Sequence, residues 1–176
     1  LQPVTHVDAE GKSAKGRWHL FAQLAKQGQF HEWATGVYEN EYRKDEGKWR
    51  IRRLHLYPTM ITPYEQGWGK ASLPASRFEP ALKPDAASPG PASNYDQSFV
   101  TPFHYTHPVR TRATTTARAP AAVTSQSLQA QLDGIDRQLA AVEDRASIDN
   151  IQTVYGCCLA PLLWGDLANL VADDGT

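Results

Sequence analysis

Aromatic and aliphatic residues alternate with polar residues from Trp33 to Tyr57, with one interruption at residues 44–47. Alternation with period two places successive side chains on opposite faces of a strand, so this stretch predicts two antiparallel strands joined by a short turn. Gly47 suits the turn, because glycine adopts positive φ angles without steric cost. The chain is therefore expected to be organised around a long aromatic hairpin.

Two further strands are predicted before this hairpin, over residues 1–8 and 13–25, which makes the N-terminal part a four-stranded antiparallel meander. Leucines share a face with arginines in the return strand of the hairpin, so we expect a β-bulge near residues 52–53. Pro58 and Pro63 are expected to end the strand pairing, because proline has no backbone N–H to donate.

The composition changes at about residue 69. Residues 69–126 are rich in Pro, Ala, Ser and Thr and predict a linker. Within this segment, residues 94–109 are rich in aromatic side chains, and we expect them to pack on the sheet or on a partner subunit.

Helical periodicity begins at about residue 127. A second helix is expected to start at Asp144 or Ser147 and to run to about Leu159, and a short third helix is expected over residues 161–171. The first helix carries an apolar stripe with 4-3-4-3 spacing, which is typical of a coiled coil or a helical hairpin. The residues of this stripe are Leu128, Leu132, Ile135, Leu139 and Val142.

The bulk composition is that of a globular protein, because 41% of the 176 residues are hydrophobic and 21% are charged. A net charge of −1 gives no long-range attraction to nucleic acid, and no apolar run approaches the roughly 20 residues that span a bilayer. The adjacent Cys157 and Cys158 predict two reduced helix cysteines, since neighbouring cysteines rarely meet the geometry of a disulfide. We therefore expect neither a nucleic-acid nor a membrane partner, and a cytoplasmic location.

The strand region also carries a family resemblance. It contains the strings GVYENEY, KWRIRRLHLYPT and PYEQGW, preceded by LQPVTHVDAEGKSAKGRW. These strings resemble the last strands of SnoaL-like proteins in the nuclear transport factor 2-like superfamily. The C-terminal string SIDNIQTVYGCCLAPLLWGDLANLVADDGT resembles the first helices of the same domain. The resemblance implies an α+β fold in which helices pack on a curved antiparallel sheet to form a SnoaL-like cone.

A SnoaL-like domain begins with helices and ends with strands, so the two pieces occur here in reversed order. One interpretation is a segment of a tandem repeat, in which residues 1–68 end one domain, residues 69–126 are the linker and residues 127–176 begin the next domain. The other is a natural permutation. In either case the helices could pack on the sheet within one chain or by swapping between chains, and we expect a homo-oligomer.

The resemblance also implies a function. SnoaL-like relatives include cyclases, dehydratases and ketosteroid-type isomerases, which transfer protons next to a carbonyl and need no metal or nucleotide. It therefore implies a cofactor-independent lyase, isomerase or cyclase for a hydrophobic, carbonyl-bearing polyketide- or steroid-like molecule. The alternative is a non-catalytic ligand-binding or assembly domain, since fold alone does not fix a reaction.

Two residues are candidates for catalysis, and no metal site is predicted. Tyr155 resembles a tyrosine that dehydratase-like relatives direct into the pocket, although the aspartate that they place five residues later is Ala160 here. His55 titrates near neutral pH and suits proton transfer. Either side chain could instead have only a structural role, Tyr155 as a core tyrosine and His55 as a histidine bonded within the sheet. The aromatic residues expected to line the pocket are Trp18, Tyr38, Trp49, Tyr57 and Trp164.

Overall fold

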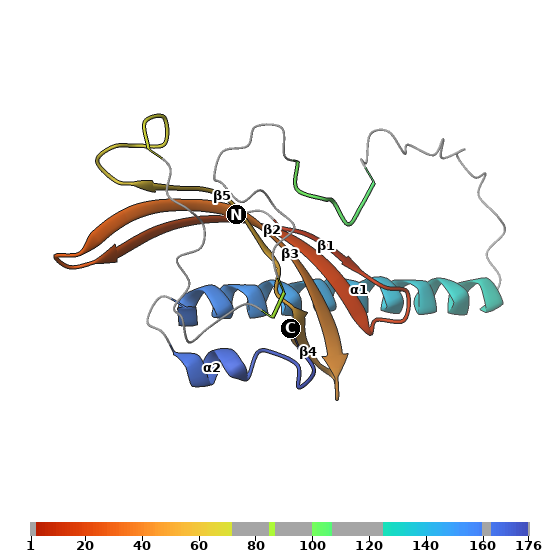
Figure 1. The fold of residues 1–176 in the computed structure, drawn as a ribbon. Coiled ribbons are helices and arrows are strands. Elements are labelled where there is room, and N and C mark those ends of the chain that lie inside the picture. Colours follow the sequence, from red (N-terminus) through yellow and green to blue (C-terminus); the bar gives the residue numbers. More distant parts are fainter. Residues whose placement is uncertain (1–2, 72–84, 87–99, 107–124, 160–162, 176) are drawn as a thin grey trace.

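The fold is α+β, with helices on the concave side of one curved antiparallel sheet (Figure 1). The sheet has five strands and is not closed into a barrel in the part of the chain that the structure describes. This computed structural model describes residues 3–71, 85–86, 100–106, 125–159 and 163–175.

The strands follow one another as hairpins, in the order β1-β2-β3-β4, and β5 pairs with β3 beside β4. The long β2–β3 hairpin forms the centre, with Trp18 opposite Tyr38 and Ala14 opposite Tyr42. Its alternation from the sequence is therefore confirmed. The strand bounds are Val4–Val7 for β1, Ser13–Lys26 for β2, Phe30–Asp45 for β3, Lys48–Arg53 for β4 and Leu56–Pro63 for β5.

The predicted bulge lies at Arg52. Glu41 pairs with Arg53 whereas the next residue, Tyr42, pairs with Ile51, so Arg52 is the extra residue. The return strand then breaks after Arg53 and resumes at Leu56, which divides the predicted fourth strand into β4 and β5. A bulge bends its strand and increases the local twist, which accounts for the divergence of β4 from β5 in Figure 1.

The prediction that prolines end the pairing holds for Pro63 and is wrong for Pro58. Pro63 is the last residue of β5 and pairs with Glu32 at the end of the β3–β5 ladder, whereas Pro58 pairs with Gly36 inside the ladder. A second register shift lies between Thr35 and Gly36. Because β5 is an edge strand, its outward N–H groups have no strand to bond, and proline is tolerated there.

The predicted break between the first and second helices is absent, because α1 is one continuous helix over Ser125–Leu159. Ser147 bonds the carbonyl of Glu143 one turn earlier, which is compatible with a helix interior. The short helix α2 covers Trp164–Ala168, less than the predicted span, and residues 160–162 lie outside the described residues. Cys157 and Cys158 are free, as predicted.

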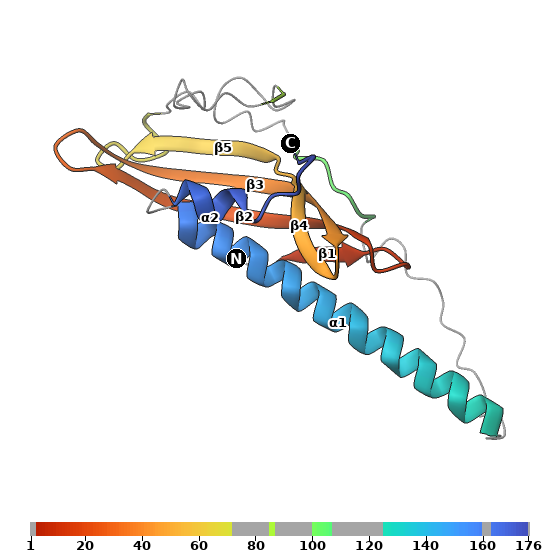
Figure 2. The same ribbon diagram turned by 90° about the horizontal axis from the view of Figure 1, so that it is seen from below.

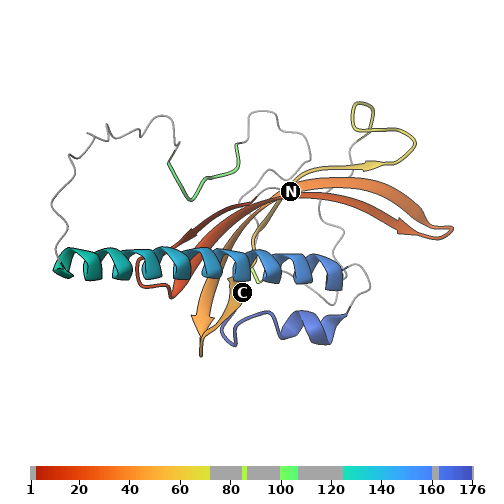
Figure 3. The same ribbon diagram turned by 180° about the vertical axis from the view of Figure 1, so that it is seen from behind.

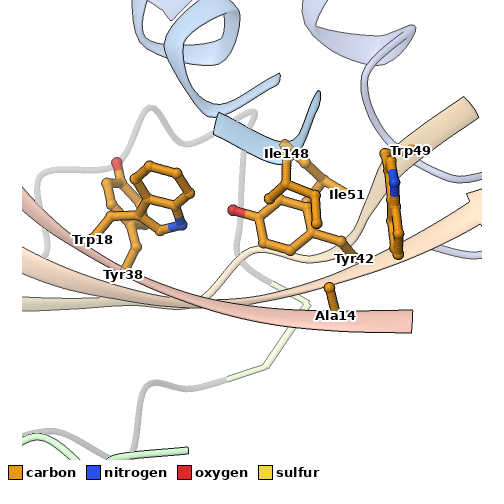
Figure 4. Close-up of a cluster of buried hydrophobic side chains, with 7 residues drawn as sticks. All are labelled: Ala14, Trp18, Tyr38, Tyr42, Trp49, Ile51 and Ile148. Atoms are coloured by element: carbon orange, nitrogen blue, oxygen red, sulfur yellow. The ribbon is translucent and has the colours of Figure 1, made fainter. Parts of the chain in front are cut away.

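The C-terminal helix completes the core of the N-terminal sheet (Figure 4). Ile148 of α1 is 0% exposed and packs among strand residues, and Ile51 of β4 is equally buried. Beyond α2 the chain also adds to the edge of β4, where Ile51 N–H donates to Leu170 O at 2.7 Å and Ala172 N–H donates to Ile51 O at 2.8 Å. The cluster consists of Ala14, Trp18, Tyr38, Tyr42, Trp49, Ile51 and Ile148.

Candidate functional site

A polar group of side chains lies between α1 and the concave face of the sheet. Gln152 of α1 is at its centre, because its Oε1 accepts hydrogen bonds from the Tyr42 hydroxyl at 2.9 Å and from Asn40 Nδ2 at 3.0 Å. Asn40 and Tyr42 are each 1% exposed. Asn40 Oδ1 accepts the backbone N–H of His55 at 3.1 Å, which fixes the orientation of the amide.

Trp18 lies beside this group (Figure 4). Its indole folds over Gly16, where an added Cβ would lie only 2.8 Å from Trp18 Nε1. The indole N–H lies close enough to the Tyr42 hydroxyl to counter part of the rise in the pKa of that phenol, but their geometry is not that of a hydrogen bond, and no other described residue accepts it. Thr5 pairs with Gly16 and so projects from the same face, and its buried Oγ1 also lacks a partner among the described residues.

Asp149 is the charged member of the group. It follows the fully buried Ile148 on α1, and its buried Oδ1 has no hydrogen-bond partner in the described part of the chain. Burial raises the pKa of the Asp149 carboxyl above its usual range. Its negative charge in turn helps to raise the pKa of Tyr42, for which burial is the larger cause.

A tyrosine pair completes the arrangement. The rings of Tyr38 and Tyr155 meet edge to face with their centroids 6.1 Å apart, and each phenol lies close enough to influence the pKa of the other. Burial raises the pKa of both phenols, so both stay protonated and able to donate at neutral pH. We call the whole set the interface cluster: Thr5, Trp18, Tyr38, Asn40, Tyr42, Asp149, Gln152 and Tyr155.

The structure does not bring the two predicted catalytic residues together. Tyr155 contacts Tyr38, whereas His55 stacks on Tyr57 with ring centroids 4.2 Å apart and senses the charge of Glu39. Tyr38 and Glu39 are successive residues of β3 and point to opposite faces of the sheet. Burial, followed by the charge of Arg53, lowers the pKa of His55.

The predicted pocket-lining aromatics are divided in the same way. Trp18, Tyr38 and Trp49 lie buried on the concave face, and Tyr57 lies buried on the convex face. Trp164 is 49% exposed on α2. These side chains therefore do not line a common cavity.

The convex face holds a half-open pocket of about 170 Å³. Pro102, Phe103 and His104 form one of its walls, so the predicted aromatic tail packs on the sheet at these described residues. The residues that line this pocket include Lys15, Glu39, Arg53, His55, Tyr57 and His104.

A buried charge network holds this wall in place. His104 Nδ1 lies 2.7 Å from Glu39 Oε2, and His104 Nε2 lies 3.0 Å from His6 Nδ1. Glu39 also pairs with Arg17, whose guanidinium lies 4.1 Å from the ring centroid of Phe103. These contacts attach the wall to the sheet and occupy both ring nitrogens of His104.

Sequence reasoning missed five members of the interface cluster: Thr5, Asn40, Tyr42, Asp149 and Gln152. One signal for Asp149 and Gln152 was available, because both are polar residues interspersed with Ile148 and Ile151 on a helix that must bury an apolar face. The position of Asn40 between Tyr38 and Tyr42 on one strand face was a similar signal.

Two kinds of site are absent from the described residues. No group of His, Cys, Asp and Glu side chains there could hold a metal ion. None of the described helices is long and apolar enough to cross a membrane. Ala160, the position at which relatives carry an aspartate, also lies outside the described residues.

Comparison with known proteins finds a similarity between the strand region and one family. Residues 1–55 match the family model of the SnoaL-like domain, which agrees with the α+β architecture and the curved sheet. A search of curated proteins found no match to the chain.

Proposed function

From the premise that residues 1–55 are SnoaL-like sequence, a family whose members are often cyclases or isomerases, we propose a function in general acid-base catalysis. The chain supplies a cofactor-independent proton-transfer site of the lyase, isomerase or cyclase type. Its substrate is a hydrophobic molecule with a carbonyl group, of the polyketide or steroid class. The site is the interface cluster.

The observation that carries this proposal is the set of polar atoms without partners. Buried polar groups are nearly always hydrogen-bonded, and leaving one unpaired costs about 1–3 kcal/mol. Trp18 Nε1, Thr5 Oγ1 and Asp149 Oδ1 are unpaired among the described residues, and they comprise a donor, a donor-acceptor and an acceptor. Each of these atoms can form a hydrogen bond with a polar group of a substrate.

The chemistry of the cluster suits proton transfer next to a carbonyl. A carboxylate with a raised pKa is a stronger base than an ordinary one, so Asp149 is suited to remove an α-proton. Protonated phenols with raised pKa values, Tyr38 and Tyr155, can donate hydrogen bonds to the enolate oxygen that forms. Asp149 thereby takes the role of base for which Ala160 is unsuited.

One observation favours the non-catalytic alternative. Ile51 and Ile148 are 0% exposed, so apolar side chains fill the space between the sheet and α1 at the edge of the cluster. A ligand-binding or assembly domain needs the packed interface but not the proton-transfer groups.

Asp149→Asn is expected to lower the rate of α-proton exchange on the order of 100-fold, and Tyr155→Phe by about tenfold, because each removes one acid-base group. The measurement is the isomerisation of a β,γ-unsaturated 3-ketosteroid, followed by absorbance of the conjugated enone, with α-deuteration in heavy water as a second assay. Asp136→Asn is the matched control, since Asp136 is exposed on the same helix. Wild-type rates equal to those of buffer on both assays would favour the non-catalytic alternative.

Asp149→Asn is also expected to raise the melting temperature at pH 7 but not at pH 3. The pKa of the folded-state carboxyl is raised, so the folded protein holds the Asp149 proton more tightly than the unfolded chain does. The wild type therefore loses stability as the pH rises through that pKa, whereas the asparagine variant does not. Thermal unfolding of both proteins at the two pH values checks this sign, and an equal difference at both would contradict the raised pKa.

A further inference from the structure

The first half of α1 extends beyond the sheet (Figures 2 and 3). It carries a stripe of apolar side chains that are exposed to solvent. We call this stripe the α1 seam. Each of its side chains is at least half exposed, with values from 50% for Leu128 to 58% for Ile135. Exposed apolar surface that is continuous along a helix marks an interaction site. The α1 seam consists of Leu128, Leu132, Ile135, Leu139 and Val142.

The α1 seam faces away from the molecule's own sheet. At 100° per residue, its centre lies roughly 170° around the helix from the centre of the sheet-facing positions. The sheet of the same chain therefore cannot cover the seam, and a partner can approach it without displacing the sheet. The sheet-facing positions are Asp144, Ile148, Ile151 and Tyr155.

Without a partner, the projecting half of the helix has little to stabilise it. Most helical stability in proteins comes from packing of an apolar face, and short isolated helices are marginal in water. Gly134 lowers the stability of this half by about 1 kcal/mol relative to alanine. Its described interactions are few, chiefly the local bond from Gln129 to Asp133.

We propose that a second copy of this chain covers the α1 seam, by forming a parallel coiled coil through residues 128–142. The 4-3-4-3 spacing places Leu132 and Leu139 at a positions, and Leu128, Ile135 and Val142 at d positions. Such a seam is complementary to itself, because the knobs of one helix fit the holes of an identical helix in the same register. A second copy is thus a partner that the sequence already specifies.

The flanking charges select the parallel orientation. In a parallel pair the acidic e positions, Asp136 and Glu143, face the neutral g positions Gln131 and Gln138 of the other copy. In an antiparallel pair in which Ile135 packs against Leu139 of the other copy, the two Asp136 carboxylates would face one another across the interface. Like charges at facing positions are destabilising, so the parallel pair is favoured.

Leu139→Lys is expected to weaken self-association of the full chain at least tenfold, because it places two charges in an apolar layer. Ala140→Lys is the matched control, since Ala140 is the next residue and is exposed on another side of the helix. Sedimentation velocity measures the effect up to about 1 mM protein, because a seam of little more than two heptads gives a weak complex. Circular dichroism at the lowest concentration verifies that both variants fold.

A wild-type chain that stays monomeric over this range overturns the proposal, as does equal weakening by the two variants. Orientation is tested by disulfide formation under mild oxidation. Leu128→Cys should give a cross-linked dimer, because parallel pairing brings the two copies of this position together, whereas Ala130→Cys, on another side of the helix, should not. No excess cross-linking of Leu128→Cys over wild type overturns the parallel arrangement.

Discussion

Replacement of Ile148 by alanine is expected to lower the free energy of unfolding by about 3–4 kcal/mol, in the upper part of the range for large-to-small core substitutions. Ile148 is 0% exposed and lies in the middle of the core cluster, between strand residues such as Tyr42 and Ile51 (Figure 4). These neighbours are held by β-ladders on both sides, so they can move only slightly into the cavity that the substitution leaves. Urea unfolding followed by tryptophan fluorescence gives the value.

Val142→Ala is the control for this prediction. Val142 lies less than two turns earlier on the same helix and is 57% exposed, so its truncation in the monomer should change the unfolding free energy by less than about 0.5 kcal/mol. Both variants are compared at a protein concentration low enough to exclude self-association. Equal effects of the two substitutions would mean that α1 does not pack on this sheet.

The helix α1 and the sheet are far apart in sequence but share one hydrophobic core. The concave side of the sheet carries Trp18, Tyr38 and Trp49, which would be exposed without a helix to cover them. A curved sheet with one apolar face is stable only when that face is packed. Ile148 is therefore a measure of how far the N-terminal strands depend on the C-terminal helix.

The strands could be predicted from the sequence because their alternation is strict. Ala14, Trp18 and Leu20 of β2 and Tyr38 and Tyr42 of β3 lie at alternate positions and all contribute to the core, so no tertiary detail is needed to recognise the strands. The turn at Gly47 was predictable for the same local reason, since its φ of 79° is costly for residues other than glycine. The neighbouring Glu46 also has a positive φ, of 49°, which its residue type did not indicate.

The position of His55 could not be predicted from alternation alone. Counting by two from Trp49 places His55 and Tyr57 on the same face as Trp49. The bulge at Arg52 adds one residue and reverses the face to which the later side chains point. Leu54 and Leu56 therefore point to the core, and His55 points to the convex face. The sequence indicated the bulge, but the facing of the residues that follow depends on its exact register.

The interface cluster was hidden for a different reason. Its members come from β1, β2, β3 and α1, and the helix joins them only through packing across more than 100 residues of sequence. Tyr155 was found through family resemblance, and Asp149 through none. Whether a buried atom such as Asp149 Oδ1 has a hydrogen-bond partner depends on the packed structure, so sequence periodicity cannot show it.

Replacement of Asp144 by alanine is expected to lower the free energy of unfolding by about 2–4 kcal/mol, because it leaves two donors of the interface without an acceptor. Asp144 Oδ1 accepts the Trp49 indole N–H at 2.9 Å and the Lys44 ammonium at 2.6 Å. The Asp144 side chain is 11% exposed, and Trp49 is 6% exposed. The Lys44 side chain is 30% exposed and can regain water, so most of the loss comes from the indole.

Asp144→Asn separates the two contributions. The amide oxygen still accepts the hydrogen bond from Trp49 but no longer attracts the charge of Lys44. The loss of unfolding free energy should therefore be about half of the loss caused by alanine. Asp136→Ala, exposed on the same helix, is the control for loss of a helix carboxylate. Chemical denaturation at neutral pH ranks the three variants. An alanine variant as stable as the wild type would show that Trp49 finds another acceptor, and that Asp144 does not anchor α1 to β4.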